Sequence, residues 1–282
     1  MIFKLIYSTS GGTTRCTTQL LEKVIKKDNH EVETINIGIS PYREDYSLIV
    51  EKIKYADLVG FGSPAYHMNM FEPMLRLFKI IAEESKRTTF KFKTFFYLNY
   101  GGITSGKAFL INARLFNGMG IGFVGALKIS APHLNKNSSF PDENISQFVE
   151  EFYNKLNINN FAPIKSKDIE TLLKPEKKRV NLIYPLAHII SNLRNIEINI
   201  NEDRCIKCGK CVHECPVAAI ELNDKVHIDV KKCIHCYHCV VTCKINALTM
   251  DAEKLDKMIC INKKILGQEK YLNQIYIPEI KS

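Results

Sequence analysis

Eight of the ten cysteines lie in one short stretch and form two runs with the same spacing. The first run is Cys205-x-x-Cys208-x-x-Cys211-x-x-x-Cys215, and 28 residues later it repeats as Cys233, Cys236, Cys239 and Cys243. Three apolar pairs repeat at the same offset, namely Ile206/Ile234, Val212/Val240 and Ala219/Ala247. The stretch is therefore an internal duplication. Where thiols stay reduced, cysteines clustered in this way indicate metal or redox chemistry rather than disulfides.

This spacing resembles that of bacterial ferredoxins, in which three close cysteines bind one 4Fe–4S cluster and the fourth ligand comes from the other repeat. The resemblance implies one cluster held by Cys205, Cys208, Cys211 and Cys243, and a second held by Cys233, Cys236, Cys239 and Cys215. One departure is Lys244, which follows Cys243 where the pattern has proline. The alternative is structural zinc, which uses paired C-x-x-C knuckles and fits two four-cysteine runs poorly.

Four other side chains between the ligands could be taken for metal ligands. We interpret them as surface or packing residues, since cysteine already fills every coordination position; they are His213, His235, Tyr237 and His238. The two cysteines outside the runs, Cys16 and Cys260, are predicted to be structural.

In the first half of the chain, a loop rich in hydroxyl groups, Ser8-Thr-Ser-Gly-Gly-Thr13, separates an apolar strand-like run from a helical pattern. Hydroxyl and N–H donors at a helix N-terminus suit a phosphate group. The loop lacks the lysine of a nucleotide-triphosphate loop and is not the dinucleotide motif G-x-G-x-x-G. Taken alone, it fits a simple helix cap equally well.

Five strand-like runs alternate with five helical patterns in residues 1–160, which predicts a doubly wound parallel sheet. The strands are expected at Phe3–Ser8, Glu31–Ile37, Asp57–Gly62, Phe92–Asn99 and Ile121–Ile129. The helices are expected at Thr13–Lys27 and near Asp45–Lys54, Phe71–Ser85, Ser105–Asn117 and Asp142–Asn157. Ligands of such sheets bind at the carboxyl ends of the strands.

The loops after the first, third and fourth strands together resemble those of flavodoxin, with Ser10 where threonine is usual and Gly12 where asparagine is usual. The resemblance implies bound FMN, whose phosphate would contact Ser8, Thr9, Ser10, Gly11, Gly12 and Thr13. Its ring system would lie between two further loops, formed by Pro64, Ala65, Tyr66, His67, Met68 and Asn69 and by Asn99, Tyr100, Gly101 and Gly102. Tyr66 and Tyr100 are the expected stacking rings.

The whole chain resembles the flavodoxin–ferredoxin fusion proteins of anaerobic bacteria and archaea. We expect an α/β flavodoxin-like, five-stranded FMN-binding domain at residues 1–160 and a small α+β two-cluster ferredoxin domain at residues 199–250. A linker at 161–198 would carry a docking helix near Leu182–Leu193. A basic amphipathic membrane helix is the less favoured interpretation of that segment. A tail at 251–282 would pack on the domains.

The formal net charge of +9 first suggests nucleic acid. Two clusters, at roughly −2 each when oxidised, and a flavin phosphate would offset much of it. We therefore expect no nucleic acid but a redox partner protein that is acidic at its docking face. No apolar run approaches the roughly 20 residues of a membrane span, and no signal peptide is recognised. The prediction is a cytoplasmic protein, with oligomerisation left open.

Flavin can pass one or two electrons and each cluster passes one. The expected function is therefore electron transfer between FMN, two 4Fe–4S clusters and a redox partner. No catalytic residues are assigned. The alternative is an FMN-dependent reductase of a small organic acceptor, supplied with electrons through the clusters.

Overall fold

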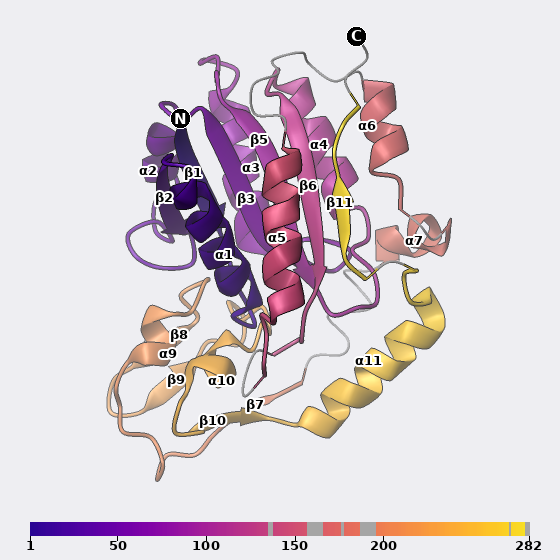
Figure 1. The fold of residues 1–282 in the computed structure, drawn as a ribbon. Coiled ribbons are helices and arrows are strands. Elements are labelled where there is room, and N and C mark those ends of the chain that lie inside the picture. Colours follow the sequence, from indigo (N-terminus) through magenta and orange to yellow (C-terminus); the bar gives the residue numbers. More distant parts are fainter. Residues whose placement is uncertain (135–137, 157–165, 176–177, 187–195, 271, 280–282) are drawn as a thin grey trace.

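The computed structural model describes residues 1–134, 138–156, 166–175, 178–186, 196–270 and 272–279 (Figure 1). Its main sheet has five parallel strands, in the order β2-β1-β3-β5-β6. Their bounds are β1 Ile2–Tyr7, β2 Glu31–Asn36, β3 Leu58–Tyr66, β5 Lys93–Tyr100 and β6 Phe123–Ser130. Numbered among themselves, these strands follow the order 2-1-3-4-5 of flavodoxin-like sheets. The predicted five-stranded doubly wound fold is confirmed.

Helices cover both faces of this sheet (Figure 1). On one face α1 (Thr13–Lys27) packs beside α5 (Glu143–Lys155). The other face carries α2 (Ser47–Ile53), α3 (Glu72–Glu84) and α4 (Ala108–Gly118). The period-2 alternation of strand residues explains both cores, because successive side chains of a strand point to opposite faces. Phe95 and Tyr97 pack under α1 and α5, whereas Phe96 between them packs on the opposite face.

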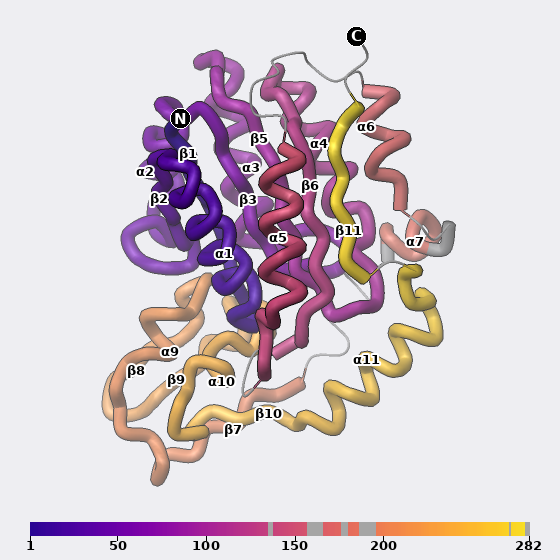
Figure 2. Tube along the Cα trace, viewed as in Figure 1, coloured from indigo at the N-terminus to yellow at the C-terminus, as the bar shows by residue number. Residues whose placement is uncertain are grey.

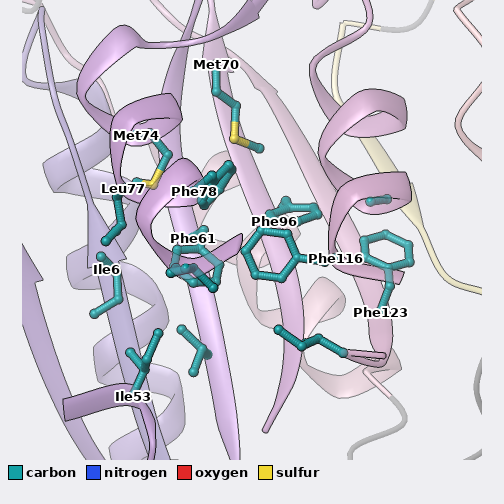
Figure 3. Packing of buried hydrophobic residues seen from close by; sticks show 14 of the residues in the cluster. Ile6, Ile53, Phe61, Met70, Met74, Leu77, Phe78, Phe96, Phe116 and Phe123 are labelled. Carbon is teal, nitrogen blue, oxygen red and sulfur yellow. The ribbon is translucent and has the colours of Figure 1, made fainter. Parts of the chain in front are cut away.

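Aromatic rings fill the core on the α3 and α4 face (Figure 3). Phe61 meets Phe78 edge to face, with ring centroids 5.1 Å apart, and Phe78 meets Phe116 at 4.9 Å. All three rings are buried, and contacts of this geometry add stability beyond the area that they bury. The core holds β3 and β5 rigidly, so the loops at their carboxyl ends start from fixed positions.

The cysteine-rich part forms a second core below the carboxyl ends of the sheet strands (Figure 1). β7 (Ile198–Ile200) pairs antiparallel with β10 (Leu248–Met250), and β8 (Ile220–Leu222) pairs antiparallel with β9 (Val226–Ile228). Two short helices, α9 (Lys210–His213) and α10 (His238–Thr242), each begin between the ligands of one cysteine run. The predicted small α+β unit is confirmed.

The C-terminal segment returns to the main sheet, as the yellow tube in Figure 2 shows. α11 (Ala252–Leu266) begins at Asp251, whose carboxylate accepts the N–H of Lys254. β11 (Gln274–Tyr276) then pairs antiparallel with β6 at the edge of the sheet. The sequence predicted only a packed tail, because a three-residue strand is too short to show a period.

Between the two units, α6 (Ser166–Leu172) packs against α4, and α7 (Lys178–Ile183) leads into a 3₁₀ turn at Tyr184–Leu186. Val180 of α7 packs on Met68, with Ile183, Tyr184 and Leu266 around them. Most of the docking helix expected near Leu182–Leu193 lies outside the described residues. None of the helices in the described part of the chain is long and apolar enough to cross a membrane.

Candidate functional site

The loop after β1 is buried, and its backbone leaves the start of α1 accessible to a ligand. Ser8, Thr9, Ser10 and Thr13 are each less than a tenth exposed. Gly12 has a φ of 87° at the helix N-cap, where no side chain caps the helix. A positive φ suits glycine or asparagine, which explains why glycine can stand where flavodoxins usually have asparagine. The first N–H groups of α1 are left for another acceptor.

Three buried polar atoms around this loop have no hydrogen-bond partner among the described residues: Ser8 Oγ, Thr14 Oγ1 and Asn99 Oδ1. Ser8 and Thr14 are fully buried, and Asn99 is 2% exposed. A buried polar group without a hydrogen bond lowers the stability of the folded protein by about 1–3 kcal/mol. Such groups are therefore rare unless a ligand or water satisfies them. Hydroxyl groups beside an uncapped helix N-terminus fit a bound phosphate. A flavin ring is rich in polar atoms and could satisfy the Asn99 oxygen.

The loop after β3 is a tight hairpin. Tyr66 of β3 pairs with Asn69 of β4 (Asn69–Met70), and the two residues between them, His67 and Met68, both have positive φ. Asn69 is held by neighbouring side chains: its Oδ1 accepts Asn112 Nδ2 at 3.1 Å, and its Nδ2 donates to the Tyr184 hydroxyl at 3.1 Å. The hairpin therefore has a fixed shape with Tyr66 at its base.

Tyr66 and Tyr100, the predicted stacking rings, both line the cavity described below. The Tyr66 hydroxyl donates to the carbonyl oxygen of His235 at 2.6 Å, and burial raises its pKa well above the ordinary value. The Tyr100 hydroxyl donates to the carbonyl oxygen of Leu272 at 2.9 Å, and its ring lies under the Lys128 ammonium group. Whether either ring stacks on flavin stays a prediction.

A loop that the sequence analysis did not single out closes the site from the end of β6. The ring of His133 lies so close to Gly101 that a Cβ atom there would be 1.5 Å from His133 Cε1. The carbonyl oxygen of His133 would lie 2.3 Å from a Cβ at Gly11. A side chain at Gly11 would collide with the backbone of this loop, whereas one at Gly101 would force the His133 ring to move. The groups packed around its ring desolvate His133 and lower its pKa, and Lys263 lowers the pKa further, although the residue still has an exposed surface.

These loops enclose a cavity of about 380 Å³ at the carboxyl ends of the strands. A cavity of this size suits one small ligand or cofactor. The sequence-predicted residues on its wall include Ser10, Thr13, Tyr66, Asn99 and Tyr100. Ser8, Thr9, Gly11, Gly12, Asn69 and Gly102 are not on the wall. The opposite wall comes from the cysteine-rich part and from α11: His235, Cys236, Tyr237, Leu255, Met258, Asn262, Ile265 and Leu266.

The two cysteine runs have the same backbone geometry, as an internal duplication requires. Ala219 N–H donates to Cys215 Sγ at 3.2 Å, and Ala247 N–H donates to Cys243 Sγ at the same distance. Gly209 and Tyr237, at equivalent positions, both cap their short helices with positive φ. Hydrogen bonds to cluster sulfurs tune reduction potentials. The structure thus gives each repeat the same N–H contact at the sulfur of its last cysteine.

The thiol environments place Cys215 close to the second cysteine run. Burial raises the pKa of the Cys211 thiol, and Cys205 and Cys208 raise it further. Burial likewise raises the pKa of Cys236, and the neighbouring thiols that add to this rise are Cys239, Cys215 and Cys233. Cys215, the last cysteine of the first run, therefore lies among the first three of the second run. The ferredoxin resemblance implies this position for Cys215, whereas the ligand sets themselves, with Cys243 joining the first run, stay a prediction.

Within the described parts of the chain, no group of three or more His, Cys, Asp or Glu side chains is placed to hold one metal ion. A 4Fe–4S cluster binds each thiolate at a different iron atom. The chemistry of the eight cysteines, all thiolate donors in two runs of ferredoxin spacing, fits such clusters.

Charged side chains join the two units beside the cavity. Arg15 of α1 forms a salt bridge of 2.6 Å with Glu214, next to Cys215. The same Glu214 oxygen lies 3.1 Å from Nε2 of His238, next to Cys239. The hydrogen bond from His238 and the ion pair with Arg15 lower the pKa of Glu214 to about 2. This carboxylate is therefore ionised at neutral pH.

His238 itself is 2% exposed, and its Nδ1 donates to the carbonyl oxygen of Ser10 at 2.6 Å. It was interpreted from sequence as a packing residue, and the structure shows that it joins a loop of the cysteine-rich part to the loop after β1. Arg43 makes a second junction, since its Nη1 donates to the carbonyl oxygen of Cys215 at 2.7 Å. Nothing in the sequence marked either residue as a contact between the two units, because their partners lie in the other unit.

Comparisons with known proteins agree with this division. Residues 197–244 match the family model described as 4Fe-4S dicluster domain. The chain is 51% identical over 43 residues to an uncharacterized polyferredoxin-like protein of Methanocaldococcus jannaschii, covering 15% of this chain and 24% of that protein. It is 64% identical over 25 residues to a probable ferredoxin of Methanosarcina thermophila, covering 9% of this chain and 43% of that protein. The chain thus spans less than half the length of both relatives.

Among solved structures, a flavodoxin from the domain Archaea is similar at 18% identity and a TM-score of 0.41, covering 54% of this chain and 92% of that one. The strand order of the main sheet defines the first unit independently of that likeness. The chain therefore joins a flavodoxin-like parallel sheet to a 4Fe–4S dicluster domain, which is the architecture of a flavodoxin–ferredoxin fusion.

Proposed function

We propose that this chain is an electron-transfer iron–sulfur flavoprotein. It would bind FMN in the cavity at the sheet edge and two 4Fe–4S clusters on its eight paired cysteines. One observation carries the proposal: the cavity wall includes both the flavodoxin-type loops and Cys236, a cysteine of the dicluster domain. A flavin in that cavity would be next to a cluster ligand, and electron transfer requires such proximity.

The chain's own residues prepare the flavin site. Ser8 and Thr14 do not line the cavity, but they lie within two residues of the wall residues Ser10 and Thr13, and their hydroxyl groups lack partners among the described residues. The uncapped start of α1 supplies N–H groups and a positive dipole end. The apolar side of α11 lines the cavity through Leu255, Met258 and Ile265. Bound flavin would exchange one or two electrons, whereas each cluster exchanges one.

The partner would be a protein with an acidic docking face. The chain carries a net charge of +9, and Lys207 and Lys210 are exposed among the first cysteines. Charge complementarity of this kind speeds protein encounter. This partner assignment, like the flavin and the individual ligand residues, is part of the proposal.

Analysis of the anaerobically purified protein tests the proposal. We expect about eight iron atoms and about eight acid-labile sulfides per chain, together with FMN on chromatography of the released flavin. Zinc in place of iron would disprove the cluster assignment. FAD alone, or no flavin after reconstitution, would disprove the flavin site. Turnover of small organic acceptors with a chemical reductant would instead support the FMN-dependent reductase.

A further inference from the structure

The two cysteine repeats share one local fold but face different surroundings. Cys208 and Cys236 occupy equivalent positions. Each is the second cysteine of its run, three residues after Cys205 or Cys233. Cys208 is exposed to solvent. Cys236 lines the cavity that Thr13, Tyr66 and the other flavodoxin-type loops enclose. The two repeats therefore offer the same cysteines, but one cluster would lie next to solvent and the other next to the cavity.

Tyr66 contacts both the cavity and the second cysteine run. Its ring lines the cavity from the end of β3. Its hydroxyl donates to the carbonyl oxygen of His235 at 2.6 Å and lies 3.3 Å from that of Ile234. Both carbonyl groups belong to the backbone that connects Cys233 to Cys236. One side chain thus fixes the spacing between the cavity and this loop.

Further contacts hold the same cysteine group against the sheet. Arg43 Nη1 donates to the carbonyl oxygen of Cys215 at 2.7 Å, and Arg15 pairs with Glu214 at 2.6 Å. His238, next to Cys239, donates to the carbonyl oxygen of Ser10. Cys215, Cys233, Cys236 and Cys239 are therefore attached to the flavodoxin-like unit from several directions.

The part of the first run around Cys208 is open to solvent instead. Ile206, the residue after Cys205, is 69% exposed, whereas its repeat partner Ile234 is partly buried. Lys207 and Lys210 are exposed on either side of Cys208. An exposed apolar side chain with a basic rim suits an acidic redox protein, since opposite charges steer the encounter.

We propose that the group Cys215, Cys233, Cys236 and Cys239 holds the cluster that exchanges electrons directly with the flavin, and that Tyr66 positions it. The cluster of Cys205, Cys208, Cys211 and Cys243 is then where an external acidic redox protein exchanges electrons. In the internal step one electron would leave the inner cluster, which would be oxidised by one unit, and would enter the flavin, which would be reduced by one unit. No bond forms or breaks. This inference rests on the proposed function and adds the route.

The equivalent cysteines provide a matched test, Cys236→Ala against Cys208→Ala. Each variant is reconstituted with iron, sulfide and FMN, and its remaining cluster is identified by paramagnetic resonance. One electron is then delivered by radiolytically generated methyl viologen radical, and flavin absorbance is followed. In the wild type we expect a phase whose rate is independent of protein concentration, as electrons redistribute internally. Cys236→Ala should lose this phase and Cys208→Ala should keep it. The reverse result would overturn the proposed route.

A second readout does not depend on transfer rate. Loss of the nearer cluster removes the nearer charge, so Cys236→Ala should shift the midpoint potential of the bound flavin more than Cys208→Ala does. Equal shifts, or a larger shift in Cys208→Ala, would contradict the assignment.

Tyr66→Phe tests the positioning role and leaves every cysteine in place. We expect Tyr66→Phe to contain the full amount of iron and FMN. The concentration-independent phase of flavin reduction should be several-fold slower than in the wild type. The same slowing should appear when Tyr66→Phe is added to Cys208→Ala. An unchanged rate would remove Tyr66 from the proposal. If wild-type protein contains both cofactors but shows no concentration-independent phase, the proposed function fails. If the phase is present but survives Cys236→Ala, only the route fails.

Discussion

His238 and Ser10 are joined by a hydrogen bond of 2.6 Å from the imidazole Nδ1 to the backbone carbonyl oxygen, although the two residues lie at opposite ends of the chain. Ser10 belongs to the loop that would hold the flavin phosphate, and His238 precedes the cluster ligand Cys239. The shape of the phosphate loop therefore depends on the dicluster domain. This argues against treating the two units as independent for flavin binding.

His238→Ala should weaken FMN binding by about 1 kcal/mol, the usual contribution of one hydrogen bond. The change leaves all eight cysteines in place, so iron content should not fall. Titration of flavin-free, cluster-loaded protein with FMN, followed by flavin fluorescence, measures the effect. Lys210→Ala at the equivalent, exposed position is the control and should bind FMN like the wild type. Equal affinities for all three proteins would show that the loop keeps its shape unaided.

Thr14→Val should act in opposite directions with and without flavin. The Thr14 hydroxyl is buried without a hydrogen-bond partner in the described part of the chain, so its removal should leave flavin-free protein as stable or more stable. FMN binding should weaken by about 1.5–3 kcal/mol, the value for a hydrogen bond to a charged group. Urea unfolding and FMN titration provide the two measurements.

The control for Thr14 is Thr18→Val, one helical turn further along α1. The Thr18 hydroxyl donates to the Thr14 carbonyl oxygen and lies 2.9 Å from the Tyr97 hydroxyl, away from the cavity. Its loss should lower stability and leave FMN affinity unchanged. If Thr14→Val destabilises flavin-free protein and spares FMN binding, its hydroxyl has no role in phosphate recognition.

The pH dependence of stability should show the lowered pKa of His133. Its pKa is lowered in the folded protein, so the unfolded chain binds the proton more readily. The folded state therefore loses stability as pH falls below about 6.5, the ordinary histidine value, until the lowered pKa is passed. Urea midpoints at pH 8 and pH 5.5 should fall further in the wild type than in His133→Gln. Parallel declines would contradict a lowered pKa at His133.

The sequence was enough to predict the features that depend on local pattern. Alternating strands and helices predicted the parallel sheet, and the repeated cysteine spacing predicted the dicluster domain. The contact between the units could not be predicted, because no pattern shows which face of the small domain meets the sheet. His238 and Glu214 were for that reason not recognised as interface residues.

The role of the C-terminal segment was also missed, although part of it left a signal. Asp251 is a good N-cap, and Leu255, Met258 and Ile259 follow at helical spacing before Gly267. That pattern could have predicted α11. Its place over the cavity could not have been predicted, since it depends on β11 pairing with β6 and on the buried carboxylate of Glu269.

Lys128 and Glu269 form an almost fully buried ion pair, at 2.6 Å with side chains 1% and 4% exposed. Glu269 also accepts the N–H of Ser105 at 2.9 Å and the hydroxyl of Thr104. Lys128→Met leaves the carboxylate without its cation and should cost about 3–5 kcal/mol of unfolding free energy. Adding Glu269→Gln should recover part of that loss, which urea unfolding of both singles and the double measures. Fully additive losses would show that the pair is not coupled.

Cys243→Ala and Cys215→Ala form a matched pair for the crossed ligand arrangement. Each residue ends one cysteine run, and each accepts an N–H at 3.2 Å from the alanine four positions on. The two changes therefore remove equivalent local contacts and differ only in the partner repeat. Because Cys215 lies among Cys233, Cys236 and Cys239, its loss should damage the cluster beside the cavity. Loss of Cys243 should damage the exposed one, held by Cys205, Cys208 and Cys211.

Paramagnetic resonance of the reduced variants separates these outcomes, with flavin absorbance read on the same samples. Cys243→Ala should retain FMN. The cluster beside the cavity stays intact in this variant, so the contacts of Tyr66, Arg43 and His238 between the two units are kept. Cys215→Ala should lose part of its FMN, because the cavity wall at Cys236 then loses its support. If each variant instead damages the cluster of its own run, the ligands are not crossed, and the proximity of Cys215 to the second run has no role in cluster binding.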